Sequence, residues 1–118
     1  MVLRMFKYSK YHNIKSITSD GIEHHSQAEA KRWTQLKLLE RAGEIKDLQR
    51  QVKYVLIPSR KEGKKTIERE CSYIADFVYT DKQGNTVVED TKGFRTKDYT
   101  IKRKLMLWVH NIKVKEVK

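Results

Sequence analysis

The fold of this 118-residue chain is decided by residues 71–92, which read CSYIADFVYTDKQGNTVVEDTK. The β-branched and aromatic side chains on both sides of DKQGN predict two strands, at residues 71–79 and 86–90. The five residues DKQGN are typical of a turn, so the two strands form an antiparallel hairpin. This hairpin is the frame around which the other elements are placed.

Two aspartates meet across the hairpin if its turn centres on Gln83. Asp76 stands inside an otherwise hydrophobic strand, and Asp90 ends the next strand. A turn centred on Gln83 sets these two residues directly opposite each other, with their Cβ atoms about 5 Å apart. Like charges at that distance repel, so the sequence predicts that a cation joins them.

A lysine follows at the spacing that phosphodiester chemistry requires. The two-residue period of a strand puts Asp90 and Lys92 on one face and Glu89 on the other. Two carboxylates that hold a divalent ion, beside an ammonium that orients a water, form an apparatus for hydrolysing phosphodiesters. Oxygen ligands favour Mg²⁺, with Mn²⁺ as a substitute. A β-bulge can turn Glu89 into the site instead of Asp90, and this alternative stays open.

The first helix opens at a capping box. Ser26 and Glu29 have the spacing at which each side chain accepts a hydrogen bond from the other's backbone amide, and the helix is predicted to run to about residue 42. Glu29, Trp33 and Leu36 recur at i, i+4 and i+7, which turns Glu29 toward the buried side. Trp33 and Trp108 are both interpreted as core residues. The neighbouring His24 and His25 are expected to point apart in an extended loop and are not interpreted as ligands.

The remaining elements complete the order α-β-β-β-α-β. A strand is predicted at 51–57, before a basic, glycine-centred turn at 60–65. A second helix is predicted at 97–110, with apolar side chains available for packing, and a short strand in the C-terminal segment 111–117. Residues 1–25 have no sustained apolar period and are interpreted as a basic N-terminal arm.

Composition narrows the classes of function. The chain has 26 Lys and Arg against 15 Asp and Glu, a net charge of +11, which favours a nucleic acid partner. Its length fits one domain, and its single cysteine excludes an intrachain disulfide and a cysteine-based zinc site. No apolar run approaches the roughly 20 residues that span a bilayer, so no membrane contact is expected and a cytoplasmic location follows by default.

These motifs resemble those of a known superfamily. Asp76, followed after a hairpin by Asp90-Thr91-Lys92, resembles the PD-(D/E)xK nuclease motif, although Ala75 stands where the superfamily often has proline. More narrowly, the chain from about Lys10 onward resembles a phage-encoded family that was formerly a domain of unknown function and is associated with Holliday-junction resolvase activity. The segments that carry this likeness are Asp20-Gly21-Ile22, Ser26-Gln27-Ala28-Glu29-Ala30, Tyr73-Ile74-Ala75-Asp76-Phe77, Val88-Glu89-Asp90-Thr91-Lys92-Gly93 and Tyr99-Thr100-Ile101-Lys102-Arg103-Lys104.

The resemblance implies an α/β (α+β) fold with a restriction-endonuclease-like α-β-β-β-α-β core, in which helices flank a central mixed sheet. Residues 26–118 are then a nuclease domain that follows the arm. The implied activity is Mg²⁺-dependent, structure-selective cleavage of branched DNA, in particular the four-way junction, by a homodimer in the host cell cytoplasm without an organic cofactor. Asp76 and Asp90 are the implied metal ligands, Glu29 a further one, and Lys92 the residue that positions the attacking water.

Several basic residues are expected to contact DNA phosphates. They are Lys7, Lys10, Lys15, Lys64, Lys65, Arg95, Lys97, Lys102, Arg103 and Lys104. Three alternatives stay open at this point: a nuclease for other branched or linear DNA, a non-catalytic DNA-binding accessory protein of recombination, and a ribosome-associated basic protein. The last of these leaves the aligned acids without a purpose.

Overall fold

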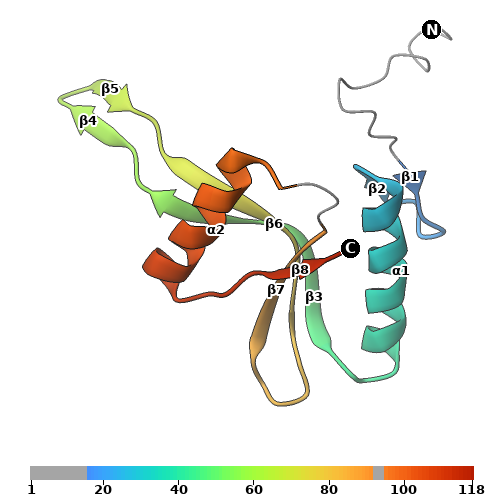
Figure 1. The fold of residues 1–118 in the computed structure, drawn as a ribbon. Coiled ribbons are helices and arrows are strands. Elements are labelled where there is room, and N and C mark those ends of the chain that lie inside the picture. The colour runs from blue at the N-terminus through green and yellow to red at the C-terminus, as the bar shows by residue number, and fades with distance from the viewer. Residues whose placement is uncertain (1–15, 92–94) are drawn as a thin grey trace, which may run out of the picture.

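The computed structural model describes residues 16–91 and 95–118. These form two helices, α1 (Gln27–Arg41) and α2 (Lys97–His110), and strands that mostly pair with their neighbours in the chain (Figure 1). The strands are β1 (Ser16–Ile17), β2 (Glu23–His24), β3 (Lys46–Ile57), β4 (Arg60–Glu62), β5 (Lys65–Glu68), β6 (Cys71–Thr80), β7 (Thr86–Thr91) and β8 (Lys115–Val117).

The central sheet has the strand order β3-β6-β7-β8. β6 runs antiparallel to both of its neighbours, β3 and β7, whereas β8 returns after α2 and pairs with β7 in parallel. The chain is therefore a mixed α/β protein with a central mixed sheet and two helices, which confirms the predicted class at this level. None of the described helices is long and apolar enough to cross a membrane.

The register of β6 against β7 follows the prediction. Phe77 lies opposite Glu89 and Val78 opposite Val88. The turn sets this register, because the Asp81 amide donates to the Asn85 carbonyl at 2.9 Å and the Asp81 carboxylate accepts from two turn amides. Continued by one residue, the same register brings Asp76 beside Asp90.

The first helix begins at the predicted cap, and the second begins at a cap that the sequence analysis did not assign. The Ser26 Oγ accepts from the Glu29 amide at 3.1 Å, and Thr96 caps α2 in the same way through the Tyr99 amide. Gly43, just past the end of α1, has φ +79°, a conformation that costs glycine little.

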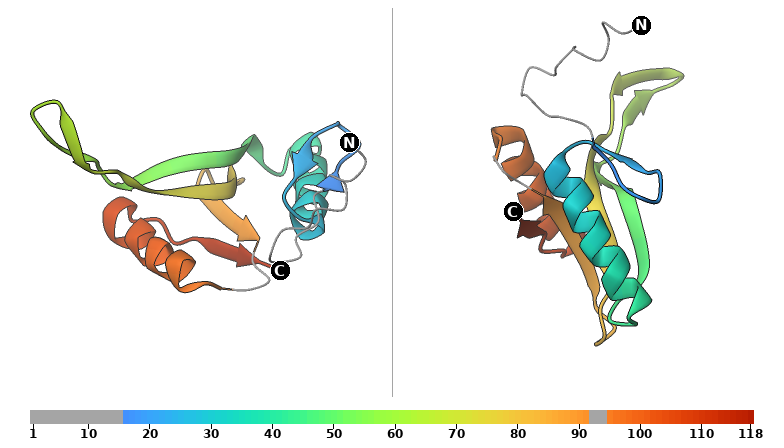
Figure 2. Two further views of the ribbon diagram at one scale, coloured as in Figure 1. Left: turned by 90° about the horizontal axis from the view of Figure 1, so that it is seen from above. Right: turned by 90° about the vertical axis from the view of Figure 1, so that its right-hand side faces the viewer.

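The core consists of two clusters that meet along β6. Tyr73 and Ala75 pack with α2 residues, whereas Phe77 and Tyr79 pack with Trp33 of α1. Figure 2 shows the two helices on separate parts of the sheet. Successive residues of a flat strand alternate between its two faces, yet the β6 residues that pack with α2 change from the odd positions of Tyr73 and Ala75 to the even position of Val78. Asp76 sits at that change.

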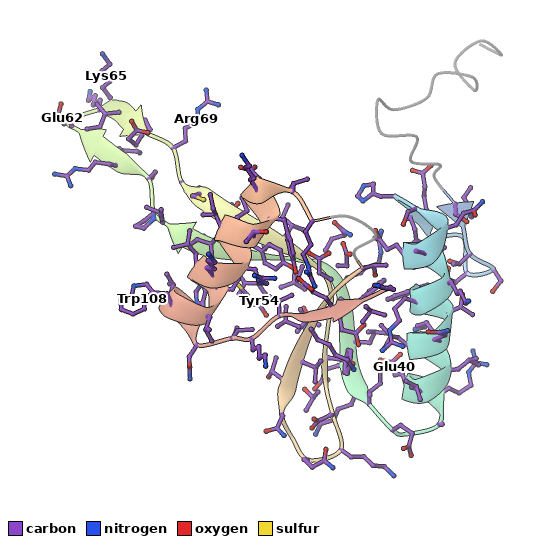
Figure 3. All side chains as sticks on the ribbon, in the orientation of Figure 1. Glu40, Tyr54, Glu62, Lys65, Arg69 and Trp108 are labelled. Carbon is purple, nitrogen blue, oxygen red and sulfur yellow. The ribbon has the colours of Figure 1, made fainter. Side chains whose placement is uncertain are left out.

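The prediction that Trp108 belongs to the core is wrong. Trp108 is 86% exposed and projects from α2 away from the sheet (Figure 3). The buried face of α2 is built from Tyr99 and Met106, and a residue two positions beyond Met106 lies about 200° around the helix. Ile101, two positions after Tyr99 and also interpreted as available for packing, is exposed for the same reason, and Val109 in the last turn of α2 is exposed as well. Trp33, by contrast, is buried as predicted.

The bounds of several strands differ from the predicted ones, because backbone pairing between strands does not follow the local side-chain pattern. β3 begins at Lys46, five residues before the predicted strand, because these polar residues pair with the far end of β6. The basic turn at 60–65 is part of a hairpin, β4–β5, and only residues 115–117 of the C-terminal segment are a strand. Within the predicted N-terminal arm, β1 and β2 pair with each other.

A buried ion pair fastens α1 to the sheet. Arg32 donates to both Glu89 carboxylate oxygens, at 2.8 and 2.7 Å, and Tyr79 donates to the same carboxylate. Glu89 is fully buried. These hydrogen bonds hold the pKa of Glu89 below its ordinary value although burial alone raises it.

We predict that Arg32→Met destabilises the protein by about 3 kcal/mol, because it leaves a buried carboxylate without its main partner. Urea unfolding followed by circular dichroism measures the change. Lys37→Met is the control, since the ion pair of Lys37 with Glu40 is partly exposed to solvent and is worth about 1 kcal/mol or less. Equal losses in the two variants would contradict the anchoring role of Arg32.

Candidate functional site

Asp76 and Asp90 come together between β6 and β7, as the sequence predicted. Asp90 is 3% exposed and Asp76 is partly buried. The backbone amide of Thr91 donates to Asp76 Oδ2 at 2.8 Å, and the Tyr73 hydroxyl donates to Asp90 Oδ2 at 2.7 Å. Each carboxyl group is therefore held by a hydrogen bond from β6 or β7.

The two carboxyl groups perturb each other. Burial raises the pKa of Asp76 to about 8, and a hydrogen bond with Asp90, together with the Asp90 charge, adds to this effect. The Thr91 amide opposes the increase, and the charge of Glu29 contributes to it. Without a cation, Asp76 is thus largely protonated at neutral pH. An arrangement in which two acids cannot both ionise cheaply is typical of metal and acid–base sites.

Tyr73 is a site residue that the sequence analysis did not assign. Its side chain is buried, and burial together with the hydrogen bond to Asp90 raises its pKa, so it remains a hydrogen-bond donor. Its ring lies 6.4 Å from that of Tyr99, whose hydroxyl donates to Glu116 at 2.7 Å. No sequence pattern marked this role, because a tyrosine in a strand is ordinarily a packing residue.

Glu29 lies on the α1 side of the site. It is 4% exposed, and its Oε1 accepts from the Gln51 side-chain amide at 3.1 Å. His24 Nδ1 lies 3.8 Å from Oε1, and His25 Nδ1 lies 3.9 Å from Oε2. His24 is buried whereas His25 is exposed, yet both approach the same carboxylate instead of pointing apart as predicted.

Gln51 owes its position to an unusual backbone. Its φ is +55°, a left-handed conformation that is uncommon outside glycine, and it lies within a strand. Its neighbours Arg50 and Val52 pair with Phe77 and Ala75, which sets Gln51 across from Asp76. Backbone strain of this kind clusters at functional sites.

Glu89, the alternative ligand in the sequence analysis, is engaged elsewhere. Its carboxylate is bound by Arg32 and Tyr79 in the α1 cluster. Asp90, the next residue, faces the other way and meets Tyr73 and Asp76. The alternation of β7 continues without a bulge through Glu89 and Asp90, which pair with consecutive residues of β8.

A cavity opens beside the paired carboxyl groups. It has a volume of about 360 Å³ and is lined by Asp76 and Asp90 from the sheet and by the first turns of α2. Lys102, predicted to contact phosphate, lines this cavity, as do Thr96 and Asp98. A cation thus faces the same space as the two acids.

The donor set fits a hard divalent cation. Within residues 16–91 and 95–118, no three His, Cys, Asp or Glu side chains form a ready metal cluster, so Glu29 does not complete one with the two aspartates. Mg²⁺ is commonly held by one or two carboxylates and keeps several waters, and Asp76 and Asp90 supply two adjacent carboxyl groups that share a hydrogen bond.

The remaining predicted phosphate contacts are scattered. Arg95 and Arg103 donate to Glu116, at 2.9 and 3.2 Å, so both are partly neutralised. Lys97 is exposed at the start of α2. Lys104 lines a second cavity, together with Lys113 and Lys115. Lys64 and Lys65 are exposed on the β4–β5 hairpin. Lys7, Lys10, Lys15 and Lys92 lie outside the described residues.

The family comparison covers nearly all of the chain. The model of a family described as "Protein of unknown function (DUF1064)" matches residues 8–118. The chain belongs to this family. Searches of the curated proteins and of the solved structures give no significant match.

We predict that the metal-free wild type loses stability relative to Asp76→Asn as pH rises from about 4 to about 8. The folded-state pKa of Asp76, about 8, exceeds its ordinary value of 3.8, so the protonated form is favoured in the folded protein and ionisation destabilises it. Urea unfolding in EDTA at several pH values gives the difference. A difference that stays constant with pH would contradict the raised pKa.

Proposed function

We propose that this chain is a Mg²⁺-dependent endonuclease of the PD-(D/E)xK type that cleaves branched DNA. The observation that carries the proposal is the pair Asp76 and Asp90, held side by side on adjacent strands and facing a cavity that Lys102 also lines. The order α1-β3-β6-β7-α2-β8 supports a restriction-endonuclease-like core. The net charge of +11 supports a nucleic acid substrate.

Each residue has a distinct role in this proposal. Asp76 and Asp90 hold Mg²⁺, or Mn²⁺ in its place, and Glu29 is a further ligand through water. When bound there, the ion neutralises charge that develops on the phosphate and makes a water more acidic. Lys102 meets the phosphate from across the cavity. Lys92, two residues after Asp90, is assigned the orientation of the attacking water from its place in the sequence.

The substrate class follows from the resemblance and from symmetry. A four-way junction is resolved by two symmetric nicks, which calls for a C2 homodimer that presents two sites. We therefore propose a Holliday-junction resolvase that acts as a dimer in the cytoplasm of the host cell. The chemistry assigned to the site needs no organic cofactor.

The decisive experiment is cleavage of a labelled synthetic four-way junction, with a matched linear duplex and single strand, in Mg²⁺ or in EDTA. We expect paired nicks on the junction alone and only with the metal. Asp76→Asn should reduce cleavage by at least about 100-fold, because it removes a metal ligand, while binding to the junction persists. Asp47→Asn is the control, since Asp47 is exposed and has a left-handed φ that asparagine tolerates.

The other outcomes separate the alternatives. Equal cleavage of linear duplex would favour a nuclease of broader substrate range. Folded wild type that binds the junction but cuts nothing in Mg²⁺ or Mn²⁺ would favour a recombination accessory protein. An Asp76→Asn variant as active as wild type would refute the assigned site.

Tyr73→Phe tests how the site is held. We predict about a 10-fold higher Mg²⁺ concentration for half-maximal cleavage, with a rate at saturating Mg²⁺ close to that of wild type, because the variant loses only the hydrogen bond that fixes Asp90. Calorimetric titration with Mn²⁺ measures the same change without cleavage. Unchanged metal affinity in a destabilised variant would show that Tyr73 acts only in packing.

A further inference from the structure

The β4–β5 hairpin is a projecting element that packing does not explain. It lies beyond the ends of β3 and β6, away from both helices (Figures 1 and 2). All residues of β4 and β5 are exposed, and the described core clusters contain none of them. A lone two-stranded ribbon in water is marginally stable, so its retention calls for a partner. We refer to residues 60–69 as the β4–β5 arm.

The β4–β5 arm carries an excess of positive charge. It has five Lys or Arg against two Glu. None of these cations forms an ion pair with a described residue. The cations that do form ion pairs, such as Arg95 and Arg103, meet acids outside residues 60–69. Lys65 and Arg69 extend into solvent in Figure 3.

The two faces of the β4–β5 arm differ in charge. On one face, each acid lies opposite a base: Arg60 pairs with Glu68, and Glu62 with Lys65. The other face carries Lys61 opposite Thr66 and has no acid. Lys64 follows Gly63, whose φ of +60° makes the tight two-residue turn at the tip. The face without acids and the tip therefore suit a polyanion.

We propose that the β4–β5 arm binds a groove of duplex DNA about one helical turn from the cleavage site. This inference rests on the proposed function. Lys65 precedes Asp76 by 11 residues, which allows a reach of at most about 36 Å along extended strands, and one turn of B-DNA is about 34 Å. A two-stranded β-ribbon fits the DNA major groove, whereas the major groove of duplex RNA is too narrow for side chains to read.

The test is equilibrium binding in EDTA, where cleavage is absent, to two junctions that differ only in arm length. One has arms of about 20 base pairs, and the other has hairpin-closed arms of about 8 base pairs, shorter than one turn. We expect wild type to bind the long-armed junction more tightly. Lys61→Gln/Lys64→Gln should lose most of this preference and lower the slope of log Kd against log salt on long arms by about 1.8, for two lost phosphate contacts.

The double variant Lys37→Gln/Lys82→Gln is the matched control. It removes the same charge from α1 and from the β6–β7 turn, where both lysines pair with glutamates. We expect it to keep the preference for long arms. Circular dichroism confirms folding of each variant, and exposed substitutions on a ribbon outside the core leave the fold intact.

Three results would overturn this proposal. The first is a wild-type protein that binds the long-armed and short-armed junctions with equal affinity, and the second is a control variant that loses the preference as much as Lys61→Gln/Lys64→Gln does. The third is equal affinity of the wild type for duplex RNA and duplex DNA of the same length. These results are independent of cleavage. If the protein binds the long-armed junction more tightly but never cuts DNA, the proposed role of the β4–β5 arm stands and the proposed nuclease activity is refuted. If the protein cuts both junctions and binds them with equal affinity, the nuclease activity stands and the proposed role of the β4–β5 arm is refuted.

Discussion

The antiparallel register of β6 against β7 is the constraint on which the candidate site depends. Fixed by the hydrogen bonds of the Asp81 turn, it sends two adjacent acids of β7 in opposite directions. Glu89 enters the α1 cluster, where Arg32 neutralises it, and Asp90 joins Asp76 on the other side. A shift of one residue would exchange these environments, burying Asp90 against Arg32 and leaving Glu89 near the cavity. One turn thus decides which acid is structural and which is available for chemistry.

The two acids illustrate how differently a protein can treat a buried carboxylate. Glu89 has a bidentate guanidinium partner and a lowered pKa, so its charge is compatible with burial. Asp76 has another acid as its neighbour and a raised pKa, so its charge is unfavourable in the folded protein. The first arrangement stabilises the fold by attaching α1 to the sheet. The second places a pair of acids where the two core clusters meet, beside a cavity that the first turns of α2 complete.

Positive charge is distributed in a way that matches this division. Arg95 and Arg103 are tied to Glu116, close to Tyr99 and the pair of aspartates, and so contribute to the architecture around the site. Lys102 faces the cavity itself. The cations of the β4–β5 arm stand apart from the described acids of the main body, on an element that adds nothing to the core. Under the proposed function, a substrate that meets both regions is long and polyanionic, as a DNA duplex is.

The sequence by itself determined the elements whose signals are local. The Ser26 cap, the turn around Gln83 and the alternation of β6 and β7 are read within a few residues. They predicted the first helix and the pairing of Asp76 with Asp90, and the apolar side chains of residues 97–110 predicted the second helix. Only the tertiary structure decided what depends on packing between distant segments. Trp108 is exposed because packing against the sheet determines which face of α2 is buried. Packing between distant segments also places Tyr73 against Asp90, and Gln51 and His24 against Glu29. Polar strand residues such as Lys46 and the β4–β5 arm pair through backbone hydrogen bonds, to which side-chain pattern is a poor guide.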